Sequence, residues 1–258
     1  MIDIATLGWA DILPFILIGF AAQMIDGALG MAFGVISQTL LVAVLGVPPA
    51  TASASVHLVE VFTTGASGAS HIWHRNVDWG LFWRLVPFGV GGGVLGAYLL
   101  SSIDASAARP FVMLYLIGIG VYLLWRAIKL AQPRFEDPRF TRPLAVAGGF
   151  LDAAGGGGWG PVVTSNLLVQ GGEPRKIIGT VNSAEFLLAL SVSITFIATI
   201  GLAAFTVVTA GLIVGGVIAA PFGALLAKRV QPRVLLFAVS VVLIVTSAYS
   251  IYRAWPII

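Results

Sequence analysis

Long apolar stretches dominate the chain and predict membrane-spanning helices. Between residues 13 and 70 the only charged residues are Asp26 and Glu60, and between residues 177 and 227 the only one is Glu185. Such runs exceed the roughly 20 apolar residues that cross a bilayer as a helix. The alternation of a transmembrane β-barrel is absent. Hydropathy therefore predicts an all-α polytopic membrane protein with six single spans, at residues 50–70, 85–100, 110–127, 177–200, 204–227 and 234–251.

Two further apolar segments, residues 13–45 and 143–169, contain glycine-rich interruptions. These read "DGALGMAFG" and "DAAGGGGWG". A straight helix over the first segment would be about 50 Å long, against a hydrocarbon core of about 30 Å. That length is too great for one span and too small for two. Both segments are therefore predicted to be broken helices.

The second half of the chain repeats the first at an offset of about 126 residues. Three residue types that are rare here recur in collinear order, as the pairs Asp26 and Asp152, Pro49 and Pro174, and Glu60 and Glu185. This order predicts a duplicated unit of one interrupted segment followed by three transmembrane helices. The expected organisation is a first membrane repeat at residues 1–130, a basic linker at 131–142 and a second membrane repeat at 143–258.

Basic residues predict the orientation of the two repeats. The loop at residues 126–142 carries five Lys and Arg residues and is expected in the cytoplasm. Every other basic loop falls on the same side if both interrupted segments are re-entrant, which also places the N-terminus outside. The two repeats are then inverted, an arrangement known from secondary transporters. The alternative, one broken crossing in each half, would make the repeats parallel.

Composition narrows the function classes. The chain is 58% hydrophobic and 10% charged, which excludes an ordinary water-soluble domain and makes the lipid bilayer its surroundings. It has no cysteine, hence no disulfide or thiolate site. The net charge of +3 is small and scattered, so no nucleic-acid partner is expected. The N-terminus lacks the basic region of a cleaved signal peptide.

The interruptions are the first candidate site. Non-helical backbone occurs at membrane depth only where it is buried in protein or lines a wet cavity. A helix that begins after the turn presents free N–H groups and a partial positive charge, which favour an anion. Gly156, Gly157 and Gly158 are therefore predicted to bind substrate. The alternative is that these glycines only permit close helix packing.

Polar side chains beside the interruptions could replace the hydration shell of a small oxyanion. The predicted substrate-binding set is Gln38, Ser55, His57, Thr164, Thr180 and Asn182. His57 and Asn182 occupy equivalent positions in the two repeats, which favours them. Hydrogen bonding between helices is the alternative role for such residues.

Intramembrane carboxylates usually face a cavity or a partner and mark ion or proton paths. Asp26, Asp152, Glu60 and Glu185 are accordingly predicted either to couple transport to protons or to serve a structural role. In the structural alternative, Asp26 and Asp152 cap the half-helices. An ionised aspartate would repel an anion in the same cavity, and the sequence leaves this conflict open.

These features resemble the sulfite exporter TauE/SafE family, also called the 4-toluene sulfonate uptake permease family. Both halves are similar to its repeated signature: "GFAAQMIDGALGMAFGVISQTLL" with "LGVPPATASASVHLVEVFTTGASG", and "GGFLDAAGGGGWGPVVTSNLL" with "GGEPRKIIGTVNSAEFLLALS". The resemblance covers essentially the whole chain and implies secondary transport of sulfite, organosulfonates or related sulfur anions across the bacterial inner membrane, often by export. The first half departs from the second in having Val35 where the second has Pro161.

Other function classes fit less well. An intramembrane aspartyl protease would need a GxGD context and a zinc protease an HExxH motif, and neither is present, so no enzyme is predicted. A cation or metal permease that uses the four carboxylates remains the alternative function. No cofactor and no metal site are expected. A homodimer is left open, as are the transported anion, its direction and the coupling ion.

Overall fold

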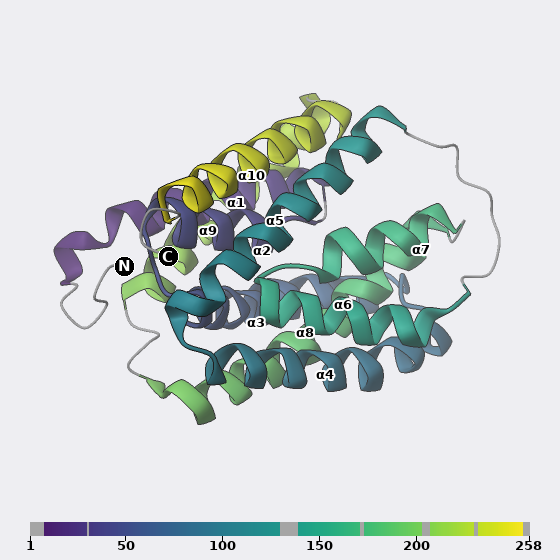
Figure 1. Ribbon diagram of the computed structural model, residues 1–258. Helices are drawn as coiled ribbons and strands as arrows, with labels where there is room; N and C mark the ends of the chain where they lie inside the picture. The colour runs from purple at the N-terminus through teal and green to yellow at the C-terminus, as the bar shows by residue number, and fades with distance from the viewer. Residues whose placement is uncertain are drawn as a thin grey trace.

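The computed structural model describes residues 8–29, 31–129, 139–170, 173–202, 207–229 and 232–254. Within these ranges every regular element is a helix (Figure 1), so the predicted all-α fold is confirmed. The elements in chain order are η2 (Trp9–Asp11), α1 (Leu13–Leu29), α2 (Phe33–Thr39), η3 (Leu40–Val44), α3 (Pro49–Trp73), α4 (Trp79–Ser102), α5 (Ala105–Ile128), α6 (Thr141–Gly155), η4 (Trp159–Thr164), α7 (Ser165–Val169), α8 (Pro174–Ile200), α9 (Val207–Arg229) and α10 (Pro232–Ala254).

The six predicted single spans correspond to α3, α4, α5, α8, α9 and α10. All except α9 are a few residues longer than hydropathy indicated, and α9 begins three residues later and ends two residues later than predicted. Their first turns explain where several of them begin. Pro49 and Pro174 occupy the first turns of α3 and α8, where the missing N–H costs nothing. The Asp78 carboxylate accepts a hydrogen bond from the Leu81 N–H and caps α4.

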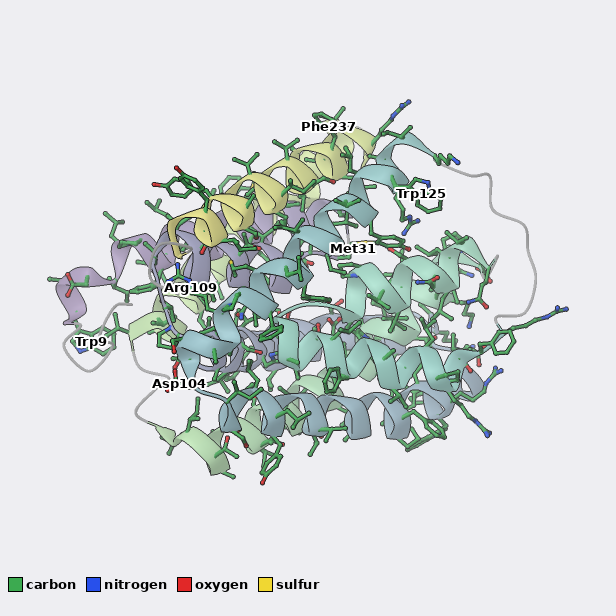
Figure 2. The ribbon with its side chains drawn as sticks, in the orientation of Figure 1. Trp9, Met31, Asp104, Arg109, Trp125 and Phe237 are labelled. Carbon is green, nitrogen blue, oxygen red and sulfur yellow. The ribbon has the colours of Figure 1, made fainter. Side chains whose placement is uncertain are left out.

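Asp104 caps α5 in the same way. Its carboxylate accepts hydrogen bonds from the hydroxyl of Ser106 at 2.6 Å and from the Ser106 N–H at 2.9 Å. These two bonds lower the pKa of the exposed Asp104 carboxyl, because they stabilise its ionised form. Figure 2 shows Asp104 and Arg109 near one end of the molecule and Trp125 towards the other, so α5 runs along its length.

Five described helical stretches are long and apolar enough to cross a membrane: Trp9–Asp26, Trp79–Ser102, Ala105–Ile128, Pro174–Ile200 and Arg233–Tyr252. Large apolar side chains on these helices point outward. Phe111 is 72% exposed and Val245 is 60% exposed. Surfaces of this kind suit contact with lipid tails. The chain is therefore a multi-pass membrane protein.

Both interrupted segments are broken helices, as predicted. α1 ends at Leu29 and α2 begins at Phe33, while α6 ends at Gly155 and the π-helical turn η4 begins at Trp159. In Figure 1, α6 starts at the right end of the molecule and α7 returns to that end. The segment therefore turns back within the bundle.

The helices of the two halves pack in matching pairs. α1 lies along α9, and its counterpart α6 lies along α4; α3 packs against α8, and α5 against α10. Figure 1 shows α5 and α10 side by side. Close approach depends on glycine: a Cβ on Gly92 of α4 would collide with the backbone of α6 at Val146, and one on Gly215 of α9 with the backbone of α1 at Ile16.

The end of α3 differs from the predicted boundary, and the linker between the two halves lies mostly outside the described residues. The span predicted at residues 50–70 ends too early, because α3 continues to Trp73 and places His71 in its last turn. The local sequence "ASHIW" has no glycine or proline to stop the helix earlier. Of the predicted linker at 131–142, only residues 139–142 lie within the described residues.

Candidate functional site

A cavity of about 290 Å³ lies between the two helix breaks. Residues from α1, α2, α3, α6, η4 and α8 line it. All four carboxylates singled out in the sequence contribute to the lining: Asp26, Glu60, Asp152 and Glu185. No lysine or arginine of the described ranges lines the cavity. Met31, labelled near the middle of the molecule in Figure 2, also lines the cavity. The cavity is therefore central, polar and rich in acidic groups.

Asp26 joins the two parts of the first broken helix. The side chain lies near the end of α1, and its Oδ1 accepts a hydrogen bond from the Phe33 N–H at the start of α2, at 3.2 Å. Ala32, between the two helices, has a φ of 109°. The first N–H groups of a helix have no partner within it, so a carboxylate here satisfies one of them.

Asp152 does the same at the second break, with more bonds. Its Oδ1 accepts from the Gly158 N–H at 2.6 Å and from the Trp159 N–H at 2.9 Å. Gly156 and Gly157 have φ values of 77° and 143°, which glycine adopts without strain. The geometry thus supports the structural alternative for both aspartates. The N–H groups expected to hold an anion contact the protein's own carboxylates.

The two breaks touch each other through their backbones. A Cβ on Gly34 would lie 3.0 Å from the Cα of Gly157, and one on Gly157 would collide with the backbone at Val35. The Tyr115 hydroxyl of α5 donates a hydrogen bond to the Gly157 carbonyl at 2.8 Å. Through this hydrogen bond, α5 supports the place where the two breaks meet. A larger residue at Gly157 would push the breaks apart.

His57 of α3 is the second partner of Asp152. Its Nε2 lies 3.1 Å from Asp152 Oδ2, and its Nδ1 lies 2.8 Å from the Ser53 carbonyl oxygen. The Ser53 hydroxyl donates to the Ala153 carbonyl, so it does not supply a proton to the ring. Since a carbonyl only accepts, Nδ1 carries a hydrogen. Nε2 is then the ring atom that faces Oδ2 of Asp152.

Glu60 and Glu185 bring two more carboxyl groups to the cavity. They are equivalent in the sequence repeat, and their helices α3 and α8 pack together. The Glu60 side chain is 5% exposed, and its carboxylate accepts no hydrogen bond from any described residue. Like charges this close in a low-dielectric interior repel strongly. Uncompensated negative charge on these carboxyl groups would therefore be unfavourable.

Polar side chains continue from Glu60 towards one end of the molecule. Along α3 they recur at helical spacing, and Asn182 of α8 faces them with its Nδ2 3.0 Å from the Ser67 hydroxyl. These α3 residues are Glu60, Thr63, Thr64, Ser67 and His71. At that end the Lys176 ammonium of α8 donates to the Arg75 carbonyl after α3. The cavity thus extends towards the end that carries these basic residues.

Beyond Glu185 the buried side chains of α8 are mostly apolar. Leu188, Val192 and Phe196 of α8 are at most 1% exposed. The ring of Phe196 lies 6.4 Å from that of His57, measured between centroids. Polar side chains therefore lie on one side of the His57–Asp152 pair, and buried apolar side chains of α8 lie on the other.

The structure separates the residues predicted from sequence into two groups. Those that line the cavity are Gly157, Gly158, Asn182, Asp26, Glu60, Asp152 and Glu185. Those that lie outside the lining are Gln38, Ser55, His57, Gly156, Thr164 and Thr180. Of the second group, His57 reaches the cavity through Asp152, whereas Thr180 accepts a hydrogen bond from the Asp78 N–H and joins α8 to α4.

Gln38 and Ser55 belong to the second group and are fully buried. Gln38 donates to the Pro49 carbonyl, but its Oε1 has no partner among the described residues, nor has the Ser55 hydroxyl. A Cβ on Gly156 would collide with the Gln38 side chain, so these two residues pack against each other. Their role in substrate binding stays a prediction.

Several lining residues were missed in the sequence. Thr63, Thr64 and Ser67 follow Glu60 at helical spacing, and that spacing was the signal that could have found them. Tyr115 was missed because α5 is otherwise an ordinary apolar span, and only the fold brings it to Gly157.

Comparison with known proteins assigns a family to this architecture. The family described as Sulfite exporter TauE/SafE matches residues 15–250. The chain is 41% identical over 257 residues to a protein of Bacillus subtilis (strain 168) called "Probable membrane transporter protein YtnM", and the match covers 95% of this chain and 84% of the relative. No solved structure matches the chain.

Proposed function

The chain belongs to the sulfite exporter TauE/SafE family, and on this premise we propose that it is a secondary transporter of small sulfur-containing anions. Its relative is likewise named a membrane transporter, so the prediction of a transporter and not an enzyme is confirmed. The proposed substrates are sulfite, organosulfonates or related anions, moved across the bacterial inner membrane. The observation that carries the proposal is the polar cavity where the two broken helices meet.

The proposed mechanism is alternating access between two inverted repeats, residues 1–130 and 143–258. The matching pairs α1 with α9 and α6 with α4 support a two-fold relation, because each broken helix packs on the other half. The return of α7 to the end where α6 starts supports a re-entrant segment (Figure 1). With the loop at 126–142 in the cytoplasm, the N-terminus lies outside.

Export is the proposed direction. The polar residues of α3 and α8 extend from the cavity to the end where Lys176 meets Arg75. By the distribution of basic loops, that end faces the cytoplasm. An anion would enter the cavity from the cytoplasm and leave on the other side after the repeats rearrange.

The anion would be bound by dipoles and not by a charged side chain. Candidate donors are the Asn182 amide and the Ser67 hydroxyl, both of which line the cavity; the hydroxyls of Thr63 and Thr64 donate to backbone carbonyls of α3. Because four carboxyl groups share this space, the anion requires positive charge, from protons or from a cation, to enter with it.

The test is flux of labelled sulfite, thiosulfate and a small organosulfonate in proteoliposomes. We expect the wild-type protein to exceed protein-free vesicles for at least one of these anions. Asn182→Ala should reduce that flux, since it removes a donor from the cavity. Asn166→Ala is the matched control, because Asn166 bonds to the Val162 carbonyl away from the cavity. Absence of flux for all three anions contradicts the proposed substrate class.

A cation permease is the second candidate function. It is favoured by one observation, the absence of lysine and arginine from the described lining of a cavity with four carboxylates. Labelled divalent cations in the same vesicles distinguish the two functions. Cation flux that is independent of sulfur anions would support the second candidate.

A further inference from the structure

We propose that one divalent transition-metal ion binds between His57, Glu60 and Asp152, at the edge of the cavity. The ligands are Nε2 of His57 and one carboxylate oxygen from each of Glu60 and Asp152. This site would supply the positive charge that the proposed anion transport requires, and in that respect it rests on the proposed function. Metal binding itself does not depend on that function.

The three donor atoms converge from two helices. His57 and Glu60 are three residues apart on α3 and therefore share one face, and Asp152 comes from α6. One ligand atom of each lies within 4.8 Å of those of the other two, and all three residues are buried. Inward-pointing His and Glu residues three positions apart also form metal sites in helical bundles. Small side-chain movements would bring these atoms to coordination distance.

Contacts to the backbone hold two of these ligands in the orientation that a metal needs. The Nδ1–H of His57 donates to the Ser53 carbonyl, which leaves Nε2 to face Asp152. Oδ1 of Asp152 accepts the N–H groups of Gly158 and Trp159, so Nε2 and Oδ2 contact only each other and are the atoms that a metal ion would bind. Metal-binding histidines commonly use their second nitrogen in this way.

The surroundings of the Glu60 carboxylate support a metal ion here independently of the distances between the ligands. Its side chain is 95% buried, lines the cavity, and accepts no hydrogen bond within the described part of the chain. Burial of an ionised carboxylate that accepts no hydrogen bond costs free energy. A metal ion between Glu60 and the His57–Asp152 pair would satisfy it.

The ligand types indicate which metal fits. One imidazole nitrogen and two carboxylate oxygens suit Zn²⁺ and the neighbouring divalent ions Mn²⁺, Fe²⁺, Co²⁺ and Ni²⁺ better than Ca²⁺ or Mg²⁺, which prefer oxygen alone. On binding, the metal ion would replace the direct contact between Nε2 and Oδ2. Three protein ligands also leave a coordination position for an oxygen atom of an anion in the cavity.

The experiment is a titration of the purified protein with Co²⁺, followed by visible absorbance, and with Zn²⁺, followed by calorimetry. We expect one ion per chain. Glu60→Gln should weaken binding at least tenfold, and so should His57→Gln and Asp152→Asn. Glu173→Gln is the control, because Glu173 is exposed and pairs with Arg175 away from the cavity. It should leave the affinity within twofold of wild type.

Glu60→Gln keeps the inference testable if the other variants fail to fold, because no described hydrogen bond depends on the Glu60 carboxylate. Absence of saturable Co²⁺ and Zn²⁺ binding overturns the proposal, and so does equal affinity in Glu60→Gln and wild type. Anion flux without metal binding would overturn this site alone. Metal binding without anion flux would overturn the substrate class alone.

Discussion

Nε2 of His57 lies 3.1 Å from Oδ2 of Asp152, although the two residues are 95 positions apart in the chain. Through this contact α3 of the first half is joined to the break in the second half. The same carboxylate caps the helix that follows the break. Asp152 therefore serves two functions at once: it secures the turn and it places an acidic group next to an imidazole in the cavity.

Removal of Asp152 should destabilise the protein more than removal of Asp26. Asp152→Ala removes two backbone hydrogen bonds and the contact to a buried imidazole, with an expected cost of about 3 kcal/mol. Asp26→Ala removes one bond at a half-buried cap, with an expected cost of about 1 kcal/mol. The melting temperatures of the two purified variants in detergent check the order. Equal temperatures would contradict the stronger role of Asp152.

Gly157→Ala should disrupt the meeting of the two breaks. The added Cβ would collide with Val35, and the φ of 143° is unfavourable for alanine. We expect a loss of about 2–4 kcal/mol in stability and a large loss of transport. Gly118→Ala is the matched control, because a Cβ on Gly118 meets nothing within 4 Å. If Gly157→Ala transports like Gly118→Ala, close contact between the breaks is not required.

Tyr115→Phe tests the support that α5 gives to the break. The substitution removes the hydroxyl that binds the Gly157 carbonyl and keeps the ring. A loss of about 1 kcal/mol is expected, together with slower transport, because the turn is held less firmly. Tyr98→Phe is the control, since Tyr98 is 56% exposed. Unchanged transport by Tyr115→Phe would limit the hydroxyl to a packing role.

Single cysteines test the inverted topology, because the chain contains none of its own. A thiol reagent that does not cross membranes should label Ser102→Cys from outside the cell. Glu173→Cys should react only after the membrane is permeabilised. If each broken helix crossed the membrane once, residue 173 would face the same side as residue 102. Labelling of both from outside would therefore contradict re-entrant segments.

Hydropathy was sufficient for most of the fold. The spans α3, α4, α5, α8, α9 and α10 were predictable, because a continuous apolar segment in a bilayer can pair all its backbone N–H and C=O groups internally only as a helix. The breaks near Asp26 and Asp152 were predictable because each apolar segment is too long for one span and contains clustered glycines. Their repetition in the second half made the interpretation stronger than either segment alone.

The contacts within the site could not be predicted from the sequence. Nothing local indicates that His57 faces Asp152, because that contact depends on the rotation and height of α3 relative to α6. The same holds for Tyr115 and Gly157, which come from separate helices. Polar residues beside a break were also insufficient to identify the lining: Ser55 and Thr164 are buried elsewhere, whereas Ser67 lines the cavity.

The most direct test of the central claim is protection of one cysteine in the cavity by the transported anion. Ser67→Cys, reconstituted in vesicles, is treated with a thiol reagent in the presence and absence of a small organosulfonate, because sulfite itself attacks such reagents. We predict that a transported organosulfonate slows the reaction at residue 67 and leaves Ser102→Cys unaffected. Transport of that anion with no protection at residue 67 would contradict a substrate site between the two helix breaks.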